Sequence, residues 1–233
     1  MDYRDRHVVV TGGTGALGTA VVGALVEAGA VCHVPYVVAA EAERFALRAH
    51  AQVKLVEAGS LAEEDAVARL YDGVPRLWAS VHLVGGFAMA PITETTKADL
   101  VKQLDMNLVT TFLCSRAAVA ALTRTGAGGR IVNTAARPAL EPRSGAGMAA
   151  YAASKAAVAA FTIALAEEVA KEAILVNAVA PSIMDTPANR AAMPNADHAA
   201  WPKAEEVAAT ILFLASPENK VTRGAIVPVY GRT

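Results

Sequence analysis

The stretch His7-Val-Val-Val-Thr11-Gly12-Gly13-Thr14-Gly15-Ala16-Leu17-Gly18 joins a short apolar run to a turn rich in glycine. The apolar run predicts a buried strand, and residues 19–28, closed by Gly29, predict a helix. Glycines permit a tight turn and close backbone approach, and a helix N-terminus attracts a pyrophosphate. The alternative is a purely structural turn, but a strand before it and a helix after it favour dinucleotide binding.

Strands and helices alternate along the rest of the chain. Further strands are predicted at 31–36, 52–56, 79–84, 130–134, 174–179 and 225–230. Further helices are predicted at 41–50, at 62–70 with Ser60 as its N-cap, at 97–124, around Tyr151 and at 204–215. The alternation predicts an α/β fold, a single doubly wound parallel sheet of Rossmann type with helices on both faces. No linker divides residues 1–233, so we interpret them as one domain in which 182–202 forms a loop or lid.

Composition narrows the function classes. The formal net charge of −1 gives no electrostatic reason to expect a nucleic acid or a membrane surface as a partner. No run approaches the ~18 apolar residues of a membrane span. Cys32 and Cys114 are far apart in apolar runs, which predicts buried, reduced thiols and a cytoplasmic protein. The histidines lack metal-ligand spacing, so no metal site is expected.

One tyrosine and one lysine stand four positions apart in Ala149-Ala-Tyr151-Ala-Ala-Ser-Lys155. On a helix these positions share a face, so the ammonium can lie near the phenol. A nearby cation favours phenolate and would lower the pKa of Tyr151. A tyrosine tuned in this way can exchange a proton with a carbonyl oxygen when a hydride reaches the carbonyl carbon. Taken alone, the pair favours the alternative of a surface lysine and a half-buried tyrosine that share a helix face by chance, and the rest of the chain reverses that preference.

Together these motifs resemble the short-chain dehydrogenase/reductase family over nearly the whole chain. Thr11 to Gly18 resembles the family's cofactor turn, with Ala16 in place of its middle glycine. Tyr151 and Lys155 match the catalytic pair, and Asn107 matches a helix asparagine that supports a proton relay through water. The resemblance implies an NAD(P)H-dependent oxidoreductase that transfers a hydride to a carbonyl or imine carbon of a small molecule.

The same resemblance implies a set of residues at the cofactor. They are Thr11, Gly12, Thr14, Ala16, Leu17, Gly18, Tyr36, Ser60, Leu61, Gly85, Tyr151, Lys155, Pro181, Ile183 and Thr186. Tyr36 ends the second strand, where an acid would hold the ribose hydroxyls of NAD. Because no acid stands there, the sequence leaves NADP and NAD open and favours NADP.

Two other departures from the family pattern concern the active site. Ala136 aligns where the family has a catalytic serine, so Thr134 or Ser144 is a candidate to supply the hydroxyl, unless the substrate needs none. Gly85-Gly86 stands where the family commonly has an Asn-Asn-Ala-Gly turn. Residues 185–201 and the missing serine also resemble dihydropteridine reductases, which makes such an enzyme one alternative.

The other alternative is a non-catalytic dinucleotide-binding sensor or scaffold. In this family the long helix from Lys97 and the Tyr151 helix pair between subunits, so a homodimer or homotetramer is expected.

Overall fold

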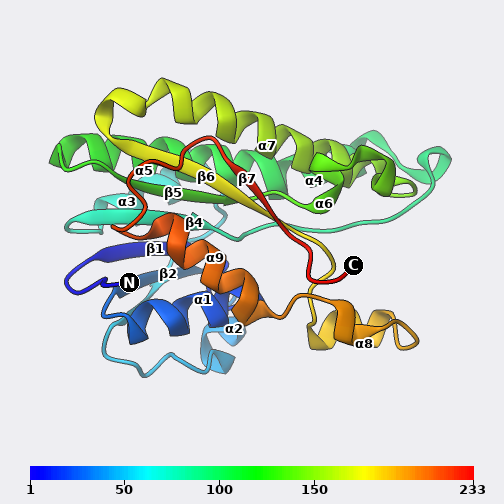
Figure 1. The fold of residues 1–233 in the computed structure, drawn as a ribbon, viewed down its shortest axis with the longest axis horizontal. Coiled ribbons are helices and arrows are strands. Elements are labelled where there is room, and N and C mark those ends of the chain that lie inside the picture. The colour runs from blue at the N-terminus through cyan, green and yellow to red at the C-terminus, as the bar shows by residue number, and fades with distance from the viewer.

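Seven parallel strands form one sheet in the computed structural model, which describes residues 1–233 (Figure 1). The strands are β1 (His7–Thr11), β2 (Val31–Tyr36), β3 (Val53–Glu57), β4 (Leu77–His82), β5 (Gly129–Thr134), β6 (Ile174–Pro181) and β7 (Ile226–Val229). Their order is β3-β2-β1-β4-β5-β6-β7. Strand order reverses between β1 and β4, and ligands of such sheets bind at the carboxyl ends of the strands at this switch point. The predicted parallel sheet is confirmed.

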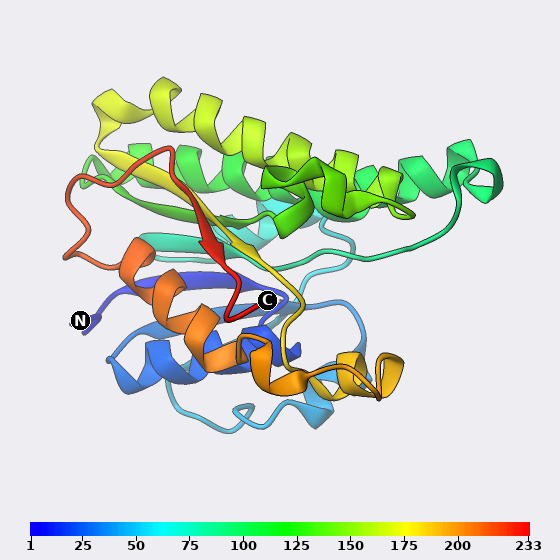
Figure 2. The ribbon, with the colours of Figure 1, turned by 45° about the vertical axis from the view of Figure 1, so that its right-hand side comes forward.

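Helices cover both faces of the sheet. They are α1 (Ala16–Glu27), α2 (Ala39–Arg44), α3 (Glu64–Asp72), α4 (Lys97–Leu104), α5 (Thr110–Thr125), α6 (Arg137–Leu140), α7 (Ala149–Glu168), α8 (Pro187–Ala192) and α9 (Ala204–Ala215). Figures 1 and 2 show α1 and α9 on one face, and α5 and α7 on the other. Val8 and Val10 of β1 enter the core beneath α1 and α9, whereas Val9 enters the core beneath α3 and α5. This alternation is the period-two pattern of a strand covered on both faces.

Several predicted boundaries are wrong, and tertiary packing explains one of them and a local turn another. The helix predicted at 41–50 is α2, which ends at Arg44 because Phe45 turns extended and buries its ring, leaving it 2 % exposed. Ser60 is not the N-cap of the next helix. Its hydroxyl accepts the Ala62 N–H at 3.3 Å in a turn, and Glu63 is the N-cap of α3.

The remaining strand ends shift by one or two residues, and two predicted loops contain helices. The stretch before Tyr151 holds α6 and a 3-10 turn (Pro142–Gly145), and the predicted lid holds α8. In the lid, the Asp185 N–H donates to the Pro202 carbonyl at 2.9 Å, and the Asp185 carboxylate pairs with Arg190. The hydrogen bond between Asp185 and Pro202 therefore joins the two ends of the lid. Figure 2 shows α8 at the same end of the molecule as the projecting loop after β4.

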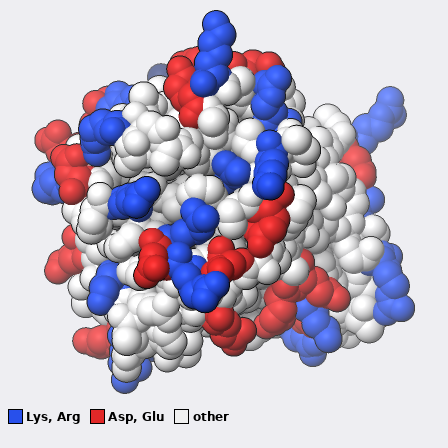
Figure 3. All heavy atoms as spheres, turned by 60° about the vertical axis from the view of Figure 1, so that its left-hand side comes forward, with Lys and Arg blue, Asp and Glu red and all other residues white.

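Two helical stretches are long and apolar enough to cross a membrane by length and composition, Lys97–Thr125 and Ala149–Glu168. The sequence expectation that no stretch reaches this limit is wrong. Both stretches instead pack against the sheet and contribute buried residues, among them Asn107 and Lys155. The face drawn in Figure 3 carries acidic and basic side chains interspersed with uncharged ones, with no single-sign field.

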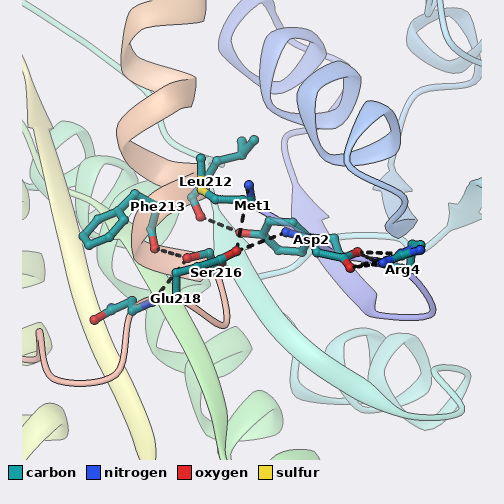
Figure 4. A network of polar contacts seen from close by, with 9 residues as sticks. Met1, Asp2, Arg4, Leu212, Phe213, Ser216 and Glu218 are labelled. Atoms are coloured by element: carbon teal, nitrogen blue, oxygen red, sulfur yellow. Dashed lines mark hydrogen bonds and ion pairs between the residues drawn. The ribbon is translucent and has the colours of Figure 1, made fainter.

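The N-terminal segment is fastened to the end of α9 on the side of the sheet away from the loops described above (Figures 1 and 4). The fully buried Tyr3 donates its hydroxyl to the Leu212 carbonyl, and the Asp2 N–H donates to Glu218 Oε1 at 3.2 Å. These contacts join two distant parts of the chain and contribute to stability rather than to the candidate site.

Candidate active site

Tyr151 and Lys155 lie one turn apart near the start of α7, as the four-residue spacing predicts. Lys155 is buried, and its ammonium donates to the Thr134 carbonyl at the end of β5, at 2.8 Å. Tyr151 is half-buried beside Phe87, whose ring meets the tyrosine ring edge-on at 5.0 Å between centroids. α7 therefore places both side chains at the carboxyl end of the sheet.

The pKa of Tyr151 corrects the sequence prediction. Burial raises the pKa of Tyr151 to about 12, whereas we expected the lysine cation to lower it. The ammonium hydrogen-bonds to Thr134, and no hydrogen bond joins it to the phenol. Burial also lowers the pKa of Lys155 to about 8. At neutral pH the phenol therefore holds its proton, and the lysine is close to losing its own.

The lowered pKa of Lys155 predicts the pH dependence of the cofactor-free enzyme. We expect kcat/KM for the dinucleotide to fall above about pH 8, approaching ~10-fold per pH unit, because deprotonated Lys155 loses its charge and a donor. Tyr151, with its pKa near 12, would stay protonated over this range. Steady-state kinetics from pH 6 to 10 measure this fall in kcat/KM. A profile that stays flat up to pH 10 would contradict the prediction.

Asn107 lies in a π-helical turn, Asp105–Val109, that joins α4 to α5. Its amide oxygen accepts the Gly86 N–H, and its amide nitrogen donates to the Gly86 carbonyl and to Ser154 Oγ, each at 3.0 Å. Ser154 in turn donates to the Tyr151 carbonyl at 2.8 Å. Asn107 thus connects the loop after β4 to the catalytic turn of α7. The relay through water stays a prediction.

Gly85 allows Lys155 and Asn107 to approach each other. A Cβ atom at Gly85 would lie 2.6 Å from Asn107 Oδ1 and 3.2 Å from Lys155 Nζ. The first distance is too short for any real contact, so a side chain cannot fit without moving Asn107. The absence of a side chain at Gly85 therefore leaves the space in which Asn107 and Lys155 lie.

The glycine-rich turn has the features of an anion-binding cradle. Gly12 has a φ of +69°, and a Cβ at Gly18 would lie 2.1 Å from the Gly12 carbonyl oxygen. No side chain caps the N-terminus of α1, and its first turn has no acid. The hydroxyl of Thr11 is buried without a hydrogen-bond partner. Free N–H groups and an unpaired hydroxyl fit a dinucleotide phosphate.

The other predicted cofactor residues follow strands at the same edge of the sheet. Leu17 and Leu61 bury their side chains in the two cores, so only their backbone can face a ligand. The Thr186 hydroxyl accepts the Asn189 N–H at 3.2 Å and caps α8. Ile183 is 45 % exposed. The remaining members lie in the glycine-rich turn or at and shortly after the ends of β2, β3 and β6. They are Thr14, Ala16, Tyr36, Ser60 and Pro181.

Ala136, which aligns with the family's catalytic serine, lies two residues after the end of β5, and its methyl group is buried. Of the two hydroxyls considered as substitutes, that of Ser144 is exposed and donates to the Glu141 carbonyl. The Thr134 hydroxyl is buried and unpartnered, in the residue whose carbonyl binds Lys155. Thr134 is therefore the one of the two that the fold brings to the site.

Two contributions were missed in the sequence. Ser154 connects Asn107 to α7, and its position between Tyr151 and Lys155 was the available signal. A buried network also links His82 Nδ1 to Asn133 Oδ1 at 2.8 Å, and Asn133 Nδ2 to Thr162 Oγ1 at 2.9 Å. This network ties β4 and β5 to α7 beneath the site. Isolated polar residues inside apolar strands were its only sequence signal.

A sequence model of the short chain dehydrogenase family matches residues 6–197. The chain belongs to the short-chain dehydrogenase/reductase family. It is similar to galactitol 2-dehydrogenase of Rhizobium johnstonii, with 37 % identity covering 96 % of this chain and 93 % of the relative. As a member of this family it is an NAD(P)-dependent oxidoreductase, as the sequence predicts.

Solved structures of the short-chain dehydrogenase/reductase fold superpose over almost the whole chain. The 3-ketoacyl-(acyl-carrier-protein) reductase of Brucella melitensis, complexed with NADH, gives a TM-score of 0.88 at 23 % identity, covering 98 % of each chain. A variant of ElxO in which a tyrosine is replaced by phenylalanine, with NADPH bound, gives 0.87 at 22 % identity, covering 97 % of each chain. At this identity the likeness establishes the fold alone.

Proposed function

We propose that the protein interconverts a small ketone and its secondary alcohol, with Tyr151 as the proton donor and acceptor. The observation that carries this proposal is the assembly of a protonated, half-buried phenol and a buried ammonium beside an uncapped helix N-terminus. A bound nicotinamide dinucleotide supplies or accepts the hydride. Positioning hydride and proton together accounts for most of the catalysis expected of such a site.

In reduction, the Tyr151 hydroxyl gives its proton to the carbonyl oxygen as the carbon receives the hydride. In oxidation, the alcohol proton passes to the Tyr151 oxygen. Lys155 keeps donors beyond its bond to Thr134 and is placed to bind the nicotinamide ribose, as the family resemblance implies. Asn107 holds the loop after β4 against Ser154, and we propose that it also supports a relay water.

We propose NADP(H) as the preferred dinucleotide. β2 itself ends without a carboxylate, at Tyr36, Val37 and Val38, so the residue that usually repels a 2′-phosphate is missing, and the carboxylate beside this strand end is Glu57, the partner of Tyr36 on β3. Arg44 and Arg48 are exposed on the adjacent segment and form no ion pair. The alternatives of a pterin reductase and a sensor have less support, since the catalytic pair is assembled and the 37 % identical relative is named a dehydrogenase.

Titration with NADPH and NADH, followed by consumption of the tighter one with simple ketones and with quinonoid dihydropterin, tests the proposal. We expect tighter binding of NADPH and turnover with ketones. Turnover with the pterin alone would favour a dihydropteridine reductase. Binding without turnover of any acceptor would overturn the enzymatic assignment.

We also propose a homodimer or homotetramer formed through α5 and α7, and a cytoplasmic location. Phe112 and Ile163 are 44 % and 48 % exposed on these helices, and the Phe112 and Phe161 rings lie 5.6 Å apart. Both cysteines are buried and unpaired, as in reduced compartments. A monomer mass by light scattering at micromolar concentration would contradict the assembly, and a periplasmic or membrane fraction would contradict the location.

A further inference from the structure

We propose that Phe87 and Met89 form an apolar subsite beside Tyr151, and that the substrate carries an apolar ring directly on or around its reacting carbon. This inference rests on the proposed function and goes beyond it by naming the substrate class. It concerns the loop after β4, in which the sequence predicted a cofactor contact only for Gly85.

Phe87 is the aromatic side chain next to the proton donor. Its ring meets the Tyr151 ring at an angle of 80° and leaves 62 % of its surface exposed. Phe87, Met89 and Ile92 are all exposed on this one loop, and exposed apolar side chains that cluster in this way mark ligand or partner sites. A substrate whose carbonyl contacts the Tyr151 hydroxyl must place its neighbouring atoms close to this ring.

Met89 extends the same apolar surface and is 64 % exposed. The Ala90 N–H donates to the Gly147 carbonyl at 2.9 Å, and Met89 Cε lies 3.1 Å from where a Gly147 Cβ would be. The loop after β4 is therefore fastened to the loop that precedes α7. Phe87, beside Tyr151, and Met89, beside Gly147, therefore both lie at the start of the catalytic helix.

The two loop segments that meet at the start of α7 lack hydrogen-bonding side chains, so Thr134 is the one unpartnered hydroxyl described at the catalytic pair besides that of Tyr151. Residues 83–92 and 145–150 contain no hydroxyl, amide or charged side chain, and Ala135 and Ala136 add only methyl groups. A hydroxyl on the carbon beside the reacting one would find no side-chain partner along these segments, and an unpaired buried polar group is costly. A polyol, such as the galactitol in the relative's name, has a hydroxyl on every carbon and fits these segments poorly.

Alcohol oxidation with NADP⁺ tests the inference with cyclohexanol and 1-phenylethanol against erythritol and galactitol. We expect kcat/KM for the ring alcohols to exceed that for the polyols by about 100-fold or more. Phe87→Ala should lower kcat/KM for 1-phenylethanol about 10- to 100-fold. The same variant should change kcat/KM for 2-propanol, which has no ring, by less than about 3-fold.

The matched control is Phe213→Ala, because Phe213 is 45 % exposed near the C-terminal end of α9, beside Ser216 and not beside any residue of the candidate site (Figure 4). This substitution should leave kcat/KM unchanged for both 1-phenylethanol and 2-propanol. Calorimetry gives a readout other than turnover. It compares 1-phenylethanol binding to the Tyr151→Phe protein with binding to the double variant that also carries Phe87→Ala, and the double variant should bind more weakly.

Equal efficiency with polyols would overturn the subsite while leaving the proposed function intact. An equal loss of kcat/KM for 1-phenylethanol and for 2-propanol in Phe87→Ala would also overturn the subsite, because Phe87 would then act only by positioning Tyr151. Failure of every alcohol and ketone, with no dinucleotide binding, would refute the proposed function and the subsite together.

Discussion

Tyr151→Phe is expected to lower kcat by about 10²- to 10⁴-fold, the usual contribution of a general acid or base. The phenol holds its proton at neutral pH because burial raises its pKa to about 12. Phenylalanine keeps the ring contact with Phe87 but has no proton to give. No hydrogen bond within the protein involves the Tyr151 hydroxyl, so its removal leaves no partner unsatisfied. The dissociation constant of NADPH should stay within about 3-fold.

Tyr3→Phe provides the matched control for this substitution. Its hydroxyl donates to the Leu212 carbonyl of α9 in a fully buried contact that involves no residue of the candidate site. Its loss should lower the free energy of unfolding by about 1 kcal/mol and leave kcat unchanged. Full activity in Tyr151→Phe, or equal losses of activity in both variants, would exclude Tyr151 as the proton donor.

Gly85→Ala is expected to lower kcat/KM by about 10²-fold or more, although it adds a single methyl group outside the catalytic pair. The new Cβ would overlap Asn107 Oδ1 at 2.6 Å and crowd Lys155 Nζ at 3.2 Å. Asn107 must then move and give up its hydrogen bonds to Gly86, which fix the loop after β4. Steady-state kinetics and a thermal melt measure the effect.

Gly23→Ala is the control, because its Cβ would meet only Leu47 Cδ1, at an ordinary 3.8 Å, on α1. An alanine in a helix interior should raise stability by about 0.5–1 kcal/mol without changing kcat/KM. Wild-type kinetics in Gly85→Ala would show that Asn107 and Lys155 are not held in the arrangement described.

The sequence was sufficient to predict the sheet, the glycine-rich turn and the shared face of Tyr151 and Lys155. These depend on local periodicity and on the short spacing of residues along one element. Turn chemistry placed Thr11 to Gly18 between a strand and a helix, but the turn is shorter than predicted, because β1 includes Thr11 and α1 begins at Ala16 rather than at residue 19. The family resemblance added Asn107, which lies with the pair at the same end of the sheet.

Properties set by distant residues could not be predicted in the same way. The pKa of Tyr151 moves opposite to the prediction because burial, not the neighbouring cation, dominates it. The hydrogen bond from Asn107 to Ser154 joins residues 47 positions apart. The end of α2 depends on Phe45 reaching a core whose other members come from elsewhere in the chain. Each of these depends on the tertiary structure rather than on a local pattern.

Transfer of deuterium from NADPH labelled at nicotinamide C4 tests the central claim most directly. Incubation with cyclohexanone should give cyclohexanol with one deuterium on the carbinol carbon, detected by mass spectrometry, and the Tyr151→Phe protein should give almost none. Unlabelled cyclohexanol, or labelled product formed equally by both proteins, would contradict hydride transfer assisted by Tyr151.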